Sequence, residues 1–122
     1  MSETRLGLVE ARFADIVWEN APLTTKELVA ICEKELNWKR TTTYTVLSKL
    51  CQRGIFAMAE RQVTVLIPKE KFRAMQTEEF LEENFHGSLP AFIAAFTSQK
   101  SLSKEEYLRL KAIVDNYTEE TK

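Results

Sequence analysis

One β-rich segment interrupts a chain whose other apolar residues recur at helical spacing. Residues 55–68 carry β-forming side chains at both ends and a single polar break at Glu60, Arg61 and Gln62. This pattern predicts a two-stranded hairpin closed by Pro68, although no Asn-Gly or Gly-Gly pair marks its turn. A lone hairpin that follows three helical patterns restricts the chain to a few mixed folds.

Three helices are predicted before the hairpin. Helical spacing of apolar residues predicts the first, which ends near Trp18 before the break at Asn20-Ala21-Pro22. A capping box formed by Thr24 and Glu27 predicts the start of the second, which ends near Asn37. The third follows Trp38 and stops at Gly54. The apolar residues of the first helix are Leu6, Val9, Phe13, Ile16 and Val17.

The third predicted helix has two different sides. Its inner side is apolar, and no acidic residue occurs between Asn37 and Ala59, although the whole chain has a net charge of -1. Acid on a helix that enters a DNA groove would be repelled by phosphate, so a local basic surface matters more than the total charge. The inner residues are Val46, Leu47, Leu50 and Cys51, and the outer ones are Thr41, Tyr44, Thr45, Ser48, Lys49 and Gln52.

Three helices followed by a hairpin is the element order of a winged helix. In that fold the third helix enters the major groove, where short Thr and Ser side chains permit close approach to base edges. Each of these features also has a simpler interpretation. The basic residues between 38 and 54 would then form an ordinary solvated face, Tyr44 would pack against the core, and Arg61 would only make the hairpin tip more soluble. The order of elements and the missing acid favour DNA contact.

The segment after Pro68 is predicted to be helical and to lack a core of its own. It comprises a long helix over 70–85, a short helix around Phe92, and a final helix that starts at the capping box of Ser103 and Glu106. So small a segment with large apolar residues is expected to bury them against a second copy, although a monomer core is the alternative. The predicted dimerisation residues are Phe80, Phe85, Leu89, Phe92, Ile93, Phe96, Tyr107, Leu110 and Val114.

These patterns predict a mainly α fold with a small β-hairpin, in which residues 1–68 form a winged helix-turn-helix domain and residues 69–122 form a helical dimerisation domain. No catalytic constellation is visible, so an enzyme is not expected. His86, Cys32 and Cys51 have unrelated spacings, which predicts no metal site and no cofactor. Without a membrane-length apolar run, a cytoplasmic protein with reduced, buried thiols is expected.

The third helix resembles the recognition-helix motif of the penicillinase-repressor family of bacterial regulators, the BlaI/MecI/CopY group. The motif is Trp, two variable residues, Thr-Thr, a spacer, often Tyr-Thr, then Leu, Lys-Leu or Arg-Leu, and a final basic residue with Gly. The first helix, with Glu10 and the ending Ile16-Val17-Trp18, is also similar, and the likeness covers roughly residues 6–117. The matching motif residues are Trp38, Thr41, Thr42, Tyr44, Thr45, Leu47, Lys49, Leu50 and Gly54.

The resemblance implies a homodimeric transcriptional repressor that binds a dyad-symmetric double-stranded DNA operator. The alternative is a winged-helix protein-interaction adaptor that binds no DNA. Some relatives are released from DNA by proteolysis under a membrane sensor, but their scissile Asn-Phe corresponds to Ala95-Phe96 here, which argues against that protease as a partner. The predicted DNA-binding residues are Lys39, Arg40, Thr41, Thr42, Tyr44, Thr45, Ser48, Lys49, Arg53 and Arg61.

Overall fold

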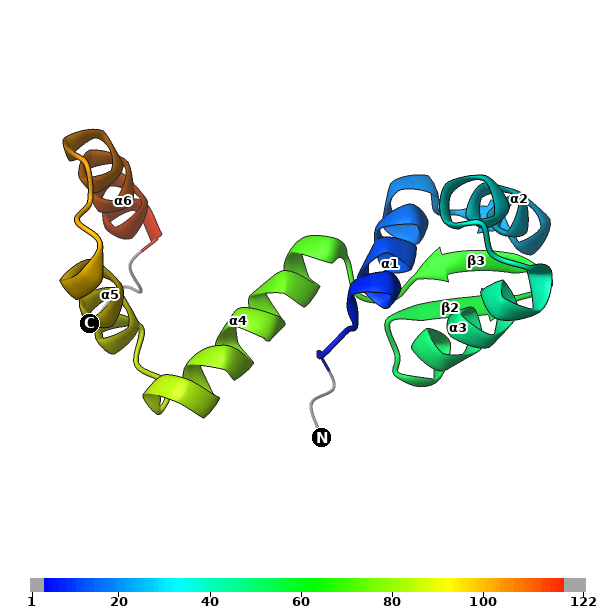
Figure 1. The fold of residues 1–122 in the computed structure, drawn as a ribbon, viewed down its shortest axis with the longest axis horizontal. Coiled ribbons are helices and arrows are strands. Elements are labelled where there is room, and N and C mark those ends of the chain that lie inside the picture. The colour runs from blue at the N-terminus through cyan, green and yellow to red at the C-terminus, as the bar shows by residue number, and fades with distance from the viewer. Residues whose placement is uncertain (1–3, 118–122) are drawn as a thin grey trace. The chain divides into compact units, whose positions relative to one another are not determined.

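The computed structural model describes residues 4–117 (Figure 1). Within this range the fold is mainly helical with one small antiparallel sheet, as predicted. The chain forms two units that divide after Phe80, inside α4, and each is described separately below. The elements are α1 (Leu8–Asn20), β1 (Leu23–Thr24), α2 (Thr25–Leu36), α3 (Arg40–Gln52), β2 (Phe56–Ala59), β3 (Gln62–Val65), α4 (Lys69–Phe85), α5 (Leu89–Gln99) and α6 (Lys104–Tyr117).

The ends of α2 are set by local side-chain and backbone chemistry. The Thr24 hydroxyl accepts a hydrogen bond from the Glu27 amide at 3.0 Å, and the Glu27 carboxylate accepts one from the Thr24 amide at 2.9 Å. This is the predicted capping box. Asn37 ends the helix in the left-handed conformation, with φ of 57°. A short connection through Trp38 then leads into α3.

The threonine run at the start of α3 forms helix despite its modest propensity. The Thr43 and Thr45 hydroxyls donate to the carbonyls of Lys39 and Thr41, at 3.3 and 2.9 Å, a back-bonding pattern available to threonine within a helix. The helix closes at Gly54, whose φ of +83° favours a residue without Cβ. These features position the predicted recognition helix.

The sheet contains a strand, β1, that no sequence pattern predicted. Its order is β1-β3-β2, with all pairs antiparallel, so β3 lies between the hairpin partner β2 and the short strand β1. Leu23 pairs with Val63. Glu60 and Arg61 form the hairpin turn with φ of 53° and 66°, which suits the right-handed twist of paired strands. The turn is further fixed because the Thr25 amide donates to the Arg61 carbonyl at 2.9 Å.

Aromatic side chains organise the core of the first unit. Phe13 of α1 stacks on Trp38 with ring centroids 5.6 Å apart. Trp18 contacts the rings of Phe56 and Phe72, each at 5.6 Å. Because Phe72 is buried here, the first part of α4 packs with the winged helix. The functional division between residues 68 and 69 stays a prediction, while the packed unit continues to Phe80.

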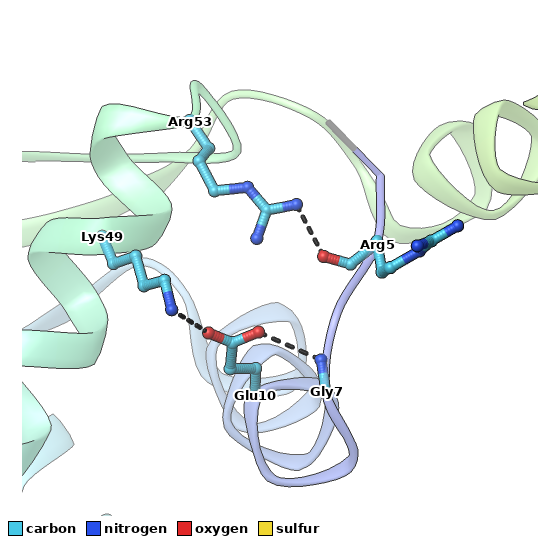
Figure 2. A network of polar contacts seen from close by, with 5 residues as sticks. All are labelled: Arg5, Gly7, Glu10, Lys49 and Arg53. Atoms are coloured by element: carbon cyan, nitrogen blue, oxygen red, sulfur yellow. Dashed lines mark hydrogen bonds and ion pairs between the residues drawn. The ribbon is translucent and has the colours of Figure 1, made fainter. Parts of the chain in front are cut away.

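A short N-terminal segment crosses from α4 to α3. Thr4 is hydrogen-bonded through its side chain to Glu79, and its carbonyl accepts from the Gln76 side chain at 2.9 Å. The next carbonyl, that of Arg5, accepts from the Arg53 guanidinium at 2.7 Å (Figure 2). These contacts hold the segment before α1 against the end of α3.

The second unit has defined helices but no buried residue in α5 or α6. Ser88 caps α5 by accepting from the Ala91 amide at 3.0 Å. Ser103 and Glu106 form the predicted capping box of α6. Helix formation in this unit is therefore locally encoded, whereas its apolar side chains are left largely uncovered within one chain.

Candidate nucleic-acid interface

The outer side of α3 is a solvent-exposed surface of short polar residues. Its inner side is held in the core by Leu47, Leu50 and Thr43, each at most 1% exposed. Thr43 was not predicted to face inward, because a polar side chain is not expected in a core. Its hydroxyl can be buried because it donates a hydrogen bond to a carbonyl of its own helix. The exposed outer residues are Thr41, Thr42, Thr45, Ser48, Lys49 and Gln52, all but the last among the predicted DNA-binding residues.

The Thr45 hydroxyl is committed as a donor. Since its hydrogen goes to the Thr41 carbonyl, its oxygen can only accept from a ligand, and its methyl group stays available for apolar contact. In a major groove this combination suits an amino group of adenine or cytosine, or the methyl of thymine. The backbone of α3 therefore narrows the chemistry that Thr45 can offer.

Lys49 is held by an acid that comes from another helix. Its Nζ lies 2.8 Å from the Glu10 carboxylate of α1, while the other oxygen of that carboxylate accepts from the Gly7 amide at 3.0 Å (Figure 2). The hydrogen bond from Lys49, followed by that from Gly7, lowers the pKa of Glu10. No acidic residue occurs within α3 itself, but Glu10 of α1 lies beside it.

Arg53 lies at the C-terminal end of α3 and is half-buried. Its guanidinium donates to the Arg5 carbonyl, close to the Lys49–Glu10 pair (Figure 2). Two predicted phosphate contacts, Lys49 and Arg53, thus lean toward α1 and the segment before it. Lys39, the N-cap residue of α3, is exposed at the opposite end of the helix.

Tyr44 and two predicted basic contacts meet in a pocket beside the hairpin turn. The pocket has a volume of about 310 Å³ and is lined by Thr25, Lys26, Val29, Arg40, Tyr44 and Arg61. The Arg40 guanidinium lies over the Tyr44 ring, 5.5 Å from its centroid. The Thr25 hydroxyl, and after it Arg40, lower the pKa of the Tyr44 phenol. Tyr44 is therefore turned toward α2 and the wing.

Thr25 and Lys26 were not among the predicted DNA-binding residues. The signal available in the sequence was the capping box at Thr24, which marks them as the first residues of α2. They lie close to Arg61 because β1 pairs with β3. With only two residues, Leu23 and Thr24, β1 is too short to be recognised as a strand from the sequence.

The fold agrees with the comparison to known families. Residues 6–116 match the family model described as penicillinase repressor. The chain belongs to the penicillinase repressor family. Members of this family are DNA-binding transcriptional repressors rather than enzymes. A search of curated proteins found no match.

For a penicillinase repressor family member, the predicted dimerisation residues are notably uncovered. Phe85 and Phe92 contact each other at 5.6 Å, and Phe92 and Phe96 at 6.5 Å, but neither α5 nor α6 contains a buried residue. Five of the nine predicted residues are about half exposed: Phe80, Leu89, Phe96, Tyr107 and Val114. The other four, Phe85, Phe92, Ile93 and Leu110, are intermediate in burial.

The thiols of this family member lie in apolar surroundings. Cys32 is buried and Cys51 is half-buried, and burial raises the pKa of both thiols. A raised pKa disfavours the reactive thiolate. Between residues 4 and 117, no three His, Cys, Asp or Glu side chains gather as a metal site would require. Over the same stretch, none of the helices has the length and apolar character needed to cross a bilayer.

Proposed function

We propose that the protein is a homodimeric transcriptional repressor that binds a dyad-symmetric operator through the outer side of α3. The observation that carries the proposal is the exposed surface from Thr41 to Lys49, on a winged helix whose chain has no acid between residues 37 and 59. An α-helix with short polar side chains fits a major groove about 12 Å wide.

The proposed DNA-binding residues divide by the chemistry they offer to DNA. Thr42 and Thr45 offer hydroxyl and methyl groups to base edges. Lys39, Arg40, Arg53 and Arg61 offer positive charge to phosphates, as does Lys49 at the Glu10 pair. Because several phosphates would be neutralised, affinity should fall steeply as salt rises.

The second unit supplies the dimer contact in this proposal. Its aromatic and aliphatic residues lack a core within one chain, and exposed apolar clusters of this kind mark protein interfaces. A twofold dimer places two α3 helices on half-sites about 34 Å apart, or a multiple of that distance.

The position at which some relatives are cleaved is poorly suited to proteolysis in this chain. Ala95 and Phe96 lie in the middle of α5. Their peptide bond is helical, so a protease could reach it only after local unfolding. Together with Ala95 in place of asparagine, this argues against a membrane sensor protease as a partner.

Selection of bound duplexes from a random DNA pool tests the proposed function. We expect enrichment of a sequence with twofold symmetry, a footprint covering both half-sites, and a dimer in sedimentation at micromolar concentration. Failure to bind any duplex at low salt would favour the protein-interaction adaptor instead. A monomer that binds one half-site would remove the dimer from the proposal and keep DNA binding.

A further inference from the structure

The pocket beside the hairpin turn combines three cationic side chains from three elements. Lys26 comes from the first turn of α2, Arg40 from the first turn of α3, and Arg61 from the β2–β3 turn. No residue of the described range 4–117 forms a salt bridge with any of them. Like charges around one opening repel each other, so an anion placed there would relieve the repulsion.

The two acids closest in sequence do not neutralise this pocket. The carboxylate of Glu27 in α2 accepts a hydrogen bond from the Thr24 amide, as part of the capping box. Glu60 precedes Arg61 in the turn but does not line the pocket. The lining therefore contains cations, hydroxyl groups and one valine, with no carboxylate.

Two of the three cationic residues, Arg40 and Arg61, are positioned by contacts that involve no ligand. Arg40 is stacked on the Tyr44 ring, at 5.5 Å from the centroid. The backbone of Arg61 is fixed by the hydrogen bond from the Thr25 amide to its carbonyl. Side chains that are positioned beforehand lose less conformational freedom on binding. The pocket is thus prepared for a small oxyanion, for which Arg and Lys are the usual ligands.

We propose that this pocket binds a single backbone phosphate of the operator, with Lys26 as a phosphate ligand and Tyr44 as a hydroxyl donor to the same group. This rests on the proposed function, because Arg40 and Tyr44 belong to α3, whose outer side would lie in the adjacent groove. Tyr44 then contacts the DNA backbone, so it positions the protein on DNA and does not read a base. The same phosphate chemistry could come from a free phosphate ion, which the test below distinguishes.

Variants of three residues test the assignment in the full-length protein. We expect Lys26→Ala to weaken binding about tenfold on both the selected operator and random duplex, and to reduce the salt slope by about one. Tyr44→Phe removes only the hydroxyl, so it should lower the affinity for the operator and the affinity for random duplex by similar factors. Lys34→Ala, an exposed lysine in the last turn of α2 outside the pocket, is the matched control and should leave affinity within twofold.

Neutral phosphate substitution identifies the partner of Lys26. Single methylphosphonates are scanned across one operator half-site, and binding is measured for the wild type and for Lys26→Ala. We expect one position where the substitution weakens the wild type about tenfold but weakens the variant no further. Additive losses at every position would overturn the proposal, as would equal affinities for Lys26→Ala and Lys34→Ala. In either case, continued binding of the wild-type protein to its operator would leave the repressor function intact.

A phosphate ion is the remaining source of the same chemistry. Operator binding is compared in phosphate and chloride at equal ionic strength. If the pocket binds an operator phosphate, Lys26→Ala should weaken operator binding even in chloride buffer that contains no phosphate. The opposite result would be that Lys26→Ala binds the operator normally in chloride and differs from the wild type only because phosphate no longer inhibits its operator binding. In that case the pocket binds a free phosphate ion, and the proposed contact with an operator phosphate is wrong.

Discussion

Lys49 of α3 and Glu10 of α1 form an ion pair of 2.8 Å, which ties the predicted recognition helix to the first helix of the same domain. The Lys49 side chain is 60% exposed and that of Glu10 only 20%. The acid is thus tucked beneath the cation, and its second oxygen is occupied by the Gly7 amide. The pair presents a restrained lysine to solvent instead of a flexible one.

Neutralising Glu10 should change DNA binding through Lys49. We expect Glu10→Gln to raise affinity for random duplex severalfold and to steepen its salt dependence, because one negative charge near phosphate is removed. Discrimination between operator and random DNA should fall, since Lys49 loses its fixed orientation. Fluorescence anisotropy on both duplexes measures this. In a Lys49→Ala background the loss of discrimination should vanish, and its persistence would mean that Glu10 acts independently of Lys49.

The same pair makes a small contribution to stability that depends on pH. Lys49 and the Gly7 amide lower the pKa of Glu10 from its ordinary 4.5, so the stabilisation is present above pH 4.5 and is lost as pH falls through the lower folded value. Urea unfolding of wild type and Glu10→Gln should differ by less than about 1 kcal/mol at pH 7. The two curves should converge in acid, and a constant difference at every pH would contradict this origin.

The Thr45 hydroxyl should contribute to sequence preference more than to overall affinity. Thr45→Val keeps a methyl group and removes a single acceptor, so discrimination at one base pair should fall by about 1 kcal/mol. Binding to random duplex should stay nearly unchanged. A panel of operators with single base changes provides the measurement. Thr43→Val is a buried control on the same helix, and a loss of discrimination equal to that of Thr45→Val would indicate a general disturbance of α3.

A charge in the exposed apolar surface of the second unit should weaken the proposed dimer. Phe96 is 47% exposed on α5, and Phe96→Lys should shift the protein toward monomer in sedimentation at micromolar concentration. Operator affinity should fall more than half-site affinity, because the two domains are no longer linked. Gln99→Lys, an exposed polar position on the same helix, is the matched control. Equal behaviour of the two variants would place the dimer contact elsewhere.

Phe72 should stabilise the winged helix although it belongs to α4. It is 1% exposed and packs on Trp18, so Phe72→Ala should lower the unfolding free energy by about 3–5 kcal/mol. Arg73→Ala, the exposed neighbour, should have little effect. Chemical denaturation followed by Trp fluorescence measures both, and a loss under about 1 kcal/mol would separate α4 from the domain core.

Much of the fold was predictable because its signals are local. The capping box of Thr24 and Glu27, the glycine after α3 and the spacing of Leu47 and Leu50 each act within a few residues. Local signals of this kind located every helix within a few residues, as well as the hairpin. The exposed side of α3 followed from the same periodicity with two exceptions. Thr43 is buried although its side chain is polar, and Tyr44 lines the pocket beside the hairpin turn.

The sequence by itself determined the helices, the hairpin and most of the outer residues of α3. Only the tertiary structure decided which distant groups meet: Leu23 with Val63, Glu10 with Lys49, and Lys26 with Arg40 and Arg61. The physical reason is that helix periodicity and capping are properties of adjacent residues. Strand pairing and ion pairs between elements depend on how a shared core orients those elements, and no local pattern records that.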